Sequence, residues 1–342
     1  MSFEYIQEIP SADSIREALP LTEELKKIKQ VRDMEIRAAL DRASDKFLLV
    51  IGPCSAHHED AVCEYISRLA KLQERVADKI LIIPRIYTNK PRTTGVGYKG
   101  MAHQPDPQKE PNIAEGILAI RRMHLRALRE THLPSADEML YPDNTPYLED
   151  LLSYVAIGAR SVENQQHRLT ASGMDIPIGM KNPTSGDVEV MLNSIYAAQR
   201  SHVFVYHRCE VRTSGNPYAH AILRGAVDSY GRNIPNYHYE NLIRVAENYI
   251  ERGMVNPTII IDTNHSNSDK QYQEQPRIGR EVMQSRRQSP LLKDIVRGLM
   301  VESYLVEGSQ KIYENVYGKS ITDPCLGWDA TETFVLNLAD AV

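Results

Sequence analysis

The sequence alternates apolar runs with segments of helical spacing over most of its length. Eight of the runs have the length and continuous apolar character of strands that are buried on both faces of a sheet. Strands that alternate with helices form parallel sheets, and eight such units indicate an α/β fold closed as a (β/α)8 TIM barrel. The expected strands are Phe47–Ile51, Ile80–Ile83, Ala136–Leu140, Val155–Ala159, Ile176–Met180, Ala219–Leu223, Thr258–Ile261 and Ile295–Val301. The expected helices are 59–77, 112–130, 145–154, 163–173, 187–200, 236–252, 270–288 and 328–340.

The main alternative architecture is a doubly wound open sheet, but the first expected strand is not followed by a Gly-x-Gly-x-x-Gly fingerprint. We therefore expect residues 46–342 to form one barrel domain. Residues 1–45 are polar and charged, with helical spacing from Leu21 to Ala38, and predict a helical N-terminal extension. Two insertions are expected, a long loop over 88–111 and a short β-hairpin within 201–213.

Composition narrows the class of function. The chain has 342 residues and a formal net charge of −5, whereas a general nucleic-acid binder normally carries a basic balance. No apolar run approaches the length of a membrane span, and the first residues lack a secretory pattern. The four cysteines form no CxxC pair. We expect them to be reduced and the protein to be cytoplasmic, with no nucleic-acid or membrane partner.

The loop after the second expected strand, Arg85–Gly100, is strongly basic within this acidic chain. It carries four cations, three threonines and three glycines, with no acid to offset them. Guanidinium groups, ammonium groups, hydroxyls and exposed backbone amides are the groups that hold phosphates and carboxylates. A solvated surface loop is the simpler interpretation. The position of this loop at a strand end favours the focusing of small anions into a cleft.

Every expected strand is followed by an ionisable or reactive side chain. In a TIM barrel the active site lies at the carboxyl ends of the strands, so these side chains would converge on one rim. A single cysteine or histidine there is readily explained as a structural group, but eight together are not. They are Cys54, Arg85, Glu138, Arg160, Lys181, Arg224, His265 and Glu302.

These residues divide by chemistry into two sets. Arg85, Lys90, Arg160, Lys181 and Arg224, with Arg92 further out, suit the binding of more than one phosphate or carboxylate. The second set consists of Cys54, His265, Glu302 and Asp323, which are metal-ligand types from four separate segments. Mixed sulfur, nitrogen and oxygen donors suit one divalent ion, Mn²⁺, Fe²⁺, Co²⁺ or Zn²⁺. An open metal beside bound anions suits Lewis-acid activation of a carbonyl on a phosphorylated sugar.

With these residues in these positions, the chain closely resembles the metal-dependent 3-deoxy-D-arabino-heptulosonate 7-phosphate (DAHP) synthases of the first type. The likeness covers residues 15–340. It is carried by Ile51-Gly-Pro-Cys-Ser55, Lys90-Pro-Arg-Thr-Thr94, Gly97-Tyr-Lys-Gly100, Gly158-Ala-Arg160, His220-Ala-Ile-Leu-Arg-Gly225, Met300-Val-Glu-Ser303, Leu305-Val-Glu-Gly308 and Gly318-Lys-Ser-Ile-Thr-Asp323.

The resemblance implies an enzyme of the shikimate pathway that condenses phosphoenolpyruvate with erythrose 4-phosphate and releases phosphate. It implies that Lys90, Cys54 and His265 are catalytic and that the metal ligands are Cys54, His265, Glu302 and Asp323. It places Arg85, Lys90, Glu138, Arg160, Lys181 and Arg224 around phosphoenolpyruvate, and Lys90, Pro91, Arg92 and Thr93 around erythrose 4-phosphate. It further implies a homodimer or homotetramer and an aromatic amino acid effector, which the sequence does not identify.

Four stretches depart from the pattern of the relatives. They read Ala159-Arg-Ser-Val-Glu-Asn-Gln165, Lys181-Asn-Pro-Thr184, Asp262-Thr-Asn-His265 and Thr322-Asp-Pro-Cys325. None of the departures removes a proposed ligand or cation. Val162 replaces a hydroxyl, which bears on how the second phosphate is held.

Three other functions are compatible with parts of this pattern. A sister reaction would use arabinose 5-phosphate or a mannosamine sugar, although the Lys-Pro-Arg-Thr motif favours the four-carbon aldose. Schiff-base aldol chemistry through Lys181 would leave the metal-type residues unexplained. A non-catalytic sensor of an aromatic amino acid or a sugar phosphate is a third possibility. Separately, Cys325 follows Asp323 so closely that we expect it to approach Cys54, where oxidation would bridge the two.

Overall fold

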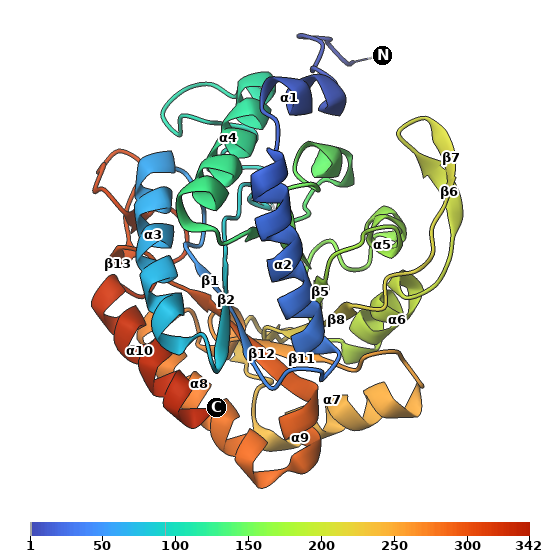
Figure 1. Cartoon of the computed structure of the whole chain (residues 1–342), viewed down its shortest axis with the longest axis vertical. Coiled ribbons are helices and arrows are strands. Elements are labelled where there is room, and N and C mark those ends of the chain that lie inside the picture. The colour runs from blue at the N-terminus through green and yellow to red at the C-terminus, as the bar shows by residue number, and fades with distance from the viewer. Residues whose placement is uncertain (1, 93) are drawn as a thin grey trace.

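A computed structural model describes residues 2–92 and 94–342 of the chain. Eight strands form one sheet in the spatial order β2-β1-β12-β11-β8-β5-β4-β3, and every hydrogen-bonded pair is parallel. A parallel bridge between Arg85 and Ala136 joins the ends of the order, so the sheet closes into the expected barrel (Figure 1). The strands are β1 Phe47–Gly52, β2 Ile80–Pro84, β3 Ser135–Glu138, β4 Leu152–Ile157, β5 Ile178–Lys181, β8 Ala219–Leu223, β11 Ile259–Asp262 and β12 Val296–Glu302.

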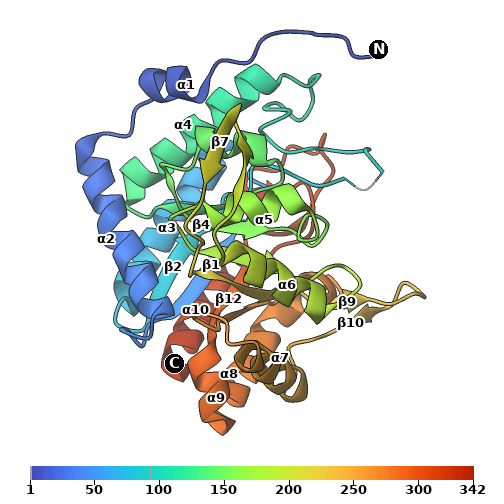
Figure 2. The same ribbon diagram turned by 90° about the vertical axis from the view of Figure 1, so that its right-hand side faces the viewer.

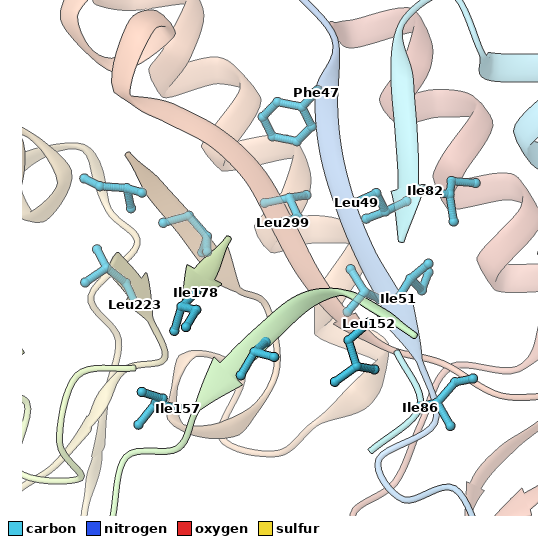
Figure 3. Packing of buried hydrophobic residues seen from close by; sticks show 14 of the residues in the cluster. Phe47, Leu49, Ile51, Ile82, Ile86, Leu152, Ile157, Ile178, Leu223 and Leu299 are labelled. Carbon is cyan, nitrogen blue, oxygen red and sulfur yellow. The ribbon is translucent and has the colours of Figure 1, made fainter. Parts of the chain in front are cut away.

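The barrel strands are buried along their whole length because each packs on two sides. Successive side chains of a strand point to opposite faces. In β1, Leu48 and Val50 belong to the core inside the barrel, while Leu49 and Ile51 belong to the core between barrel and helices. Figure 3 shows members of the second core, among them Leu49, Ile82 and Leu299. Two apolar faces explain why these strands read as continuous apolar runs.

The helices cover the outside of the barrel and begin at side chains suited to capping. Asn112 accepts a hydrogen bond from the Glu115 amide at 3.1 Å, and Asp187 accepts one from the Val190 amide at 3.0 Å. Such caps satisfy backbone donors that have no partner within the helix. The helices after β1 are α3 Glu59–Val76, α4 Ile113–Thr131, α5 Gln165–Ser172, α6 Val188–Ala198, α7 Tyr239–Glu251, α8 Gln275–Gln288, α9 Pro290–Ile295 and α10 Trp328–Ala341.

The expected helix over 145–154 is wrong. The chain forms a 3-10 helix over Pro142–Tyr147, and β4 begins at Leu152. Pro142 occupies the start of this element, where its missing amide hydrogen costs nothing, whereas Pro146 inside the element cannot donate a backbone hydrogen bond, which keeps the element short. The apolar residues before Val155 therefore belong to the strand, not to a helix.

The N-terminal extension contains two helices, α1 Ala12–Ala18 and α2 Glu23–Leu40. Ile36, Ala39 and Leu40 of α2 join the core inside the barrel, where they meet residues such as Leu48 and Met300. The Arg297 guanidinium of β12 donates hydrogen bonds to the Ala39 carbonyl at 2.8 and 3.1 Å. In Figure 1, α2 lies across the strands. The end of α2 thus completes the core of the barrel at the end where its strands begin.

The inserted hairpin is confirmed. Strands β6 Val203–Tyr206 and β7 Cys209–Arg212 pair antiparallel and project from the body beside α5 and α6 (Figure 1). A second short pair, β9 Ala226–Val227 and β10 Asn233–Ile234, extends away from the barrel in Figure 2. A third, β13 Val306–Ser309 and β14 Lys319–Ser320, precedes α10.

Across the described ranges, none of the helices combines the length and apolar content that crossing a bilayer requires.

Replacing Leu40 by Ala tests the role of α2 in the barrel core. Leu40 is 1% exposed, so Leu40→Ala removes packed atoms and should lower the free energy of unfolding by about 2–5 kcal/mol. The matched control is Met34→Ala on the same helix, where the side chain is 60% exposed and the expected change is within about 0.5 kcal/mol. Urea unfolding measures both. Equal effects at the two positions would contradict the packing of α2 into the barrel.

Candidate active site

The carboxyl ends of the barrel strands surround a cavity of about 510 Å³. Its wall is unusually rich in charged side chains, contributed by segments that lie far apart in the sequence. The predicted residues that line it are Cys54, Arg85, Lys90, Pro91, Arg92, Glu138, Arg160, Lys181, Arg224, His265 and Asp323. Thr93 lies outside the described residues. Barrel closure has therefore brought most of the predicted site residues to one place.

Three side chains with metal-binding atoms meet beside this cavity and form a metal-type group. A sulfur of Cys54 and carboxylate oxygens of Glu302 and Asp323 all lie within 4.8 Å of one another. The grouping follows from topology, because β1 and β12 are neighbours and Gly52 pairs with Glu302. One thiol and two carboxylates, largely removed from water, match the donor set of a divalent transition metal.

His265 lines the same cavity but is not a member of this three-residue group. It follows β11 with a positive φ of 52°, and its Nδ1 lies 2.9 Å from Oδ2 of Asp262. The sequence predicts His265 as a metal ligand and indicates no role for Asp262. The structure shows that Asp262, 1% exposed, contacts both His265 and Lys181.

The strongest electrostatic contact in the site is buried. The Arg85 Nη2 lies 2.9 Å from Oε1 of Glu302, and both side chains are at most 2% exposed. Burial disfavours the charged carboxylate, but Arg85 and then His265 hold the pKa of Glu302 below its ordinary value. The other Glu302 oxygen accepts a hydrogen bond from Asn264 Nδ2 at 2.5 Å. Glu302 is therefore charged and fixed in place on both sides.

Lys90 links the cations of the cavity to the metal-type group. Its Nζ lies 3.3 Å from the Cys54 sulfur. Burial is the main cause that raises the pKa of the Cys54 thiol, and Glu302 raises it further while Lys90 opposes both. In the absence of a bound cation this thiol is protonated at neutral pH. A divalent cation would favour its thiolate form.

Two arginines in the cavity wall, Arg160 and Arg224, form no salt bridge within the part of the chain that the structure describes. Arg224 is largely buried, and its Nη1 has no hydrogen-bond partner among the described residues. Burial is the main cause that lowers the pKa of its guanidinium, and Arg160 lowers it as well, while Asp262, Asp323 and Glu302 oppose the shift. The Nη1 donor lacks an acceptor among the described residues. A phosphate or carboxylate would supply it.

Glu138 also faces this part of the cavity. A Cβ placed on Gly158 would lie 2.1 Å from Oε1 of Glu138, so glycine at this position leaves room for the carboxylate. In the basic loop, Arg92 Nε donates to the Tyr98 carbonyl at 2.8 Å, and the Lys90 amide donates to the Lys99 carbonyl at 3.0 Å. These contacts fold the loop over the cavity.

The two cysteines near the metal-type group do approach each other, as the sequence predicted. The Cys54 amide lies 3.3 Å from the Cys325 sulfur, and all four cysteines, each in a described range, are free thiols. Sequence reasoning did not assign roles to Asn264 or Tyr87. The position of Asn264 in the polar stretch Asp262–His265, next to a predicted metal ligand, could have indicated a role for it. The Tyr87 ring lies against the Arg85 guanidinium, 3.9 Å from ring centre to Cζ.

Comparisons with known proteins agree on one family. The sequence model described as the DAHP synthetase I family matches residues 32–335. A Phe-sensitive phospho-2-dehydro-3-deoxyheptonate aldolase of Escherichia coli K12 is 37% identical over 345 residues, covering 98% of this chain and 95% of the relative. A Trp-sensitive one of Enterobacter agglomerans is 39% identical over 315 residues, covering 90% and 87%.

A solved structure agrees with the sequence relatives. The phospho-2-dehydro-3-deoxyheptonate aldolase of Francisella tularensis SCHU S4 superposes with a TM-score of 0.92 at 32% identity, covering 100% of this chain and 98% of that one. The likeness therefore extends over the barrel, the N-terminal helices and the insertions together.

Removing Arg85 tests the buried contact with Glu302. Arg85→Met leaves a buried carboxylate without its counter-charge, so metal-free protein should lose about 3–5 kcal/mol of unfolding free energy. The matched control is Arg75→Met, which breaks the surface pair of Arg75 with Glu332 and should cost less than about 1 kcal/mol. Urea unfolding in the presence of a chelator measures both. Similar losses for the two variants would refute the assignment of a strong buried pair.

Proposed function

Because the chain belongs to the DAHP synthetase I family, whose enzymes catalyse the first step of aromatic biosynthesis, we propose that this cavity is its active site. The reaction condenses phosphoenolpyruvate with D-erythrose 4-phosphate and water to give DAHP and phosphate. The observation that carries the proposal is the three-residue metal-type group beside cations that lack acidic partners. A site for two phosphorylated substrates and a Lewis acid needs both features.

We assign the metal to Cys54, Glu302 and Asp323, with His265 as a fourth ligand once its ring leaves Asp262. The proximity of a thiol, the buried carboxylate of Glu302 and the half-buried carboxylate of Asp323 supports one divalent ion per subunit, Mn²⁺, Fe²⁺, Co²⁺ or Zn²⁺. When bound, the ion supplies Lewis-acid polarisation of the aldose carbonyl. The protein's part is to hold these ligands, with Arg85 and Asn264 orienting Glu302.

Phosphoenolpyruvate is assigned to six residues of the cavity wall, Arg85, Lys90, Glu138, Arg160, Lys181 and Arg224. Arg224 Nη1 has no hydrogen-bond partner among the described residues and could bind an anion, and Arg160 lines the same cavity. Lys181 is held by Asp262 at 3.0 Å, and Arg85 by Glu302. Glu138 lies among these cations and would orient them. Lys90 stands between the metal-type group and the cations, so its Nζ is placed to hold or deliver a proton.

Erythrose 4-phosphate is assigned to Lys90, Pro91, Arg92 and Thr93. Arg92 uses Nε for the Tyr98 carbonyl, and its two terminal nitrogens, which bond to none of the described residues, could bind a phosphate. Both substrates are anionic, and cations on both sides of the cavity would hold them face to face. Orientation of this kind is worth several orders of magnitude in rate.

Schiff-base chemistry at Lys181 is disfavoured by its contacts. Asp262 lies 3.0 Å from Nζ, so the amine is engaged in a buried ion pair, whereas a lysine that attacks a carbonyl needs a free amine. The metal-type group would have no role in such a reaction.

Several finer properties also belong to the proposal. Relatives named as Phe-sensitive and Trp-sensitive support an aromatic amino acid effector, and the family resemblance supports a homodimer or homotetramer. The substrates are intermediates of central metabolism, which supports a cytoplasmic location. We assign residues 1–45 to an extension and 46–342 to one catalytic barrel domain.

Turnover tests the reaction and the metal together. Chelator-stripped protein should consume phosphoenolpyruvate in the presence of erythrose 4-phosphate only after Mn²⁺ is restored. Cys54→Ala should abolish this recovery, because it removes the thiol ligand. Cys209→Ala, at an exposed cysteine on the hairpin, should recover as the wild type does.

Two results would overturn parts of this proposal. Turnover that is indifferent to the chelator would refute the metal assignment. Turnover with a five- or six-carbon aldose in place of erythrose 4-phosphate would show that the protein catalyses the sister reaction, with arabinose 5-phosphate or a mannosamine sugar as substrate.

Feedback is tested by adding phenylalanine, tyrosine and tryptophan separately to the turnover assay. We expect one of the three to lower the rate at millimolar concentration or below. Unchanged rates with all three, in enzyme that is otherwise active, would contradict an aromatic effector.

A further inference from the structure

A buried carboxylate beneath the cavity has no role in the reaction described above. Asp137, on β3, is 3% exposed and is not among the residues that line the active-site cavity; it lines a separate small cavity with Asn89 and Glu138. Its Oδ1 accepts hydrogen bonds from the backbone amides of Thr88 at 2.9 Å and Glu138 at 2.7 Å. Its Oδ2 accepts a short hydrogen bond from the Thr88 hydroxyl. One carboxylate thus holds the segments that follow two neighbouring strands.

Thr88 is the anchor of the basic loop. Its carbonyl accepts a hydrogen bond from the Ala102 amide at 3.1 Å, and two residues later the Lys90 amide donates to Lys99. Gly100, with a φ of 97°, lies so close to Thr88 that a Cβ there would be 2.3 Å from the Thr88 carbonyl oxygen. The loop is therefore closed upon itself, and the contacts between Thr88 and Asp137 attach it to the barrel.

The helix after this loop supports the same carboxylate. His124 of α4 is buried, with Nδ1 2.7 Å from the Ser135 hydroxyl and Nε2 3.5 Å from Oδ2 of Asp137. Ser135 lies on β3, two residues before Asp137. Asp137 is thereby fixed between its own strand, the basic loop and α4.

We propose that Asp137 is a positioning residue that sets the places of Lys90 and Glu138 in the active site. It acts on Lys90 through Thr88 and on Glu138 through the backbone amide of Glu138. The inference rests on the proposed roles of Lys90 and Glu138. Displacing a catalytic group by about 1 Å can cost roughly 100-fold in rate, so a fixed anchor for the loop has a direct catalytic consequence.

The first test removes the hydroxyl of Thr88 from Mn²⁺-loaded enzyme. Thr88→Val should lower kcat by roughly 10–100-fold, because Lys90 loses its fixed place. The dissociation constant for phosphoenolpyruvate, measured by calorimetry, should change much less than kcat, because Lys181 on β5 and Arg160 and Arg224, which follow β4 and β8, would still hold the substrate. Thr88→Ser keeps the hydroxyl and should restore most of kcat.

The matched control is Thr213→Val. Thr213 lies beyond the hairpin, away from the cavity, and its hydroxyl contacts Ser172 at 2.8 Å and the His202 amide at 3.0 Å. This variant should keep the wild-type kcat even if its melting temperature falls as far as that of Thr88→Val. A kcat loss of equal size in both variants would overturn the proposal, as would a wild-type kcat in Thr88→Val.

The second test asks whether Asp137 acts through Thr88. Asp137→Asn retains an oxygen for the two backbone amides but places an amide donor against the Thr88 hydroxyl. Its kcat loss should largely disappear in the Thr88→Val background, because residues that act as one unit are not additive. Fully additive losses would overturn the inference. Wild-type enzyme without turnover would instead refute the proposed function, so the two failures are distinguishable.

Discussion

Closure of the parallel sheet is the constraint on which the rest of this structure depends. Eight strands run in one direction, and the bridge from Arg85 to Ala136 joins the first and last strands of the order. All carboxyl ends therefore share one rim. Cys54 and Glu302, almost 250 positions apart in the sequence, become neighbours because β1 pairs with β12. Without closure, β2 and β3 would lie at opposite edges of an open sheet, and Arg85 would be separated from Glu138.

Many charged side chains lie close together at the rim, which is electrostatically unfavourable. Only some of these charges are neutralised by a partner of opposite sign. Arg85 is paired with Glu302, and Lys181 with Asp262, both inside the protein. Such pairs contribute little net stability, because desolvation opposes their attraction. They do fix the direction of each side chain. Arg160 and Arg224, by contrast, form no salt bridge with a described residue, and guanidinium groups in a cavity wall suit the binding of an anion.

The two ends of the barrel have different tasks. At one end α2 inserts Ile36, Ala39 and Leu40 into the core, and Arg297 donates to the Ala39 carbonyl. At the other end His124, Ser135 and Asp137 form a polar network, and Asp137 holds the basic loop through Thr88. Stability is concentrated where the strands begin, whereas the carboxyl ends carry the chemistry, as is usual for this fold.

The sequence by itself determined the eight strands, the helices that separate them and the inserted hairpin, because periodicity and apolar runs are local properties. It also identified which side chains follow the strands, and the family resemblance assigned their roles. The helix expected over 145–154 was wrong for a local reason as well, because a 3-10 helix that contains Pro142 and Pro146 forms there instead.

Only the tertiary structure decided which side chains meet. It grouped Cys54 with Glu302 and Asp323, directed His265 to Asp262, and placed Asp137 under Thr88. These contacts join residues on different strands, and their distances depend on register, barrel closure and side-chain direction. No pattern within a single segment contains that information, because it arises only when separate segments pack together.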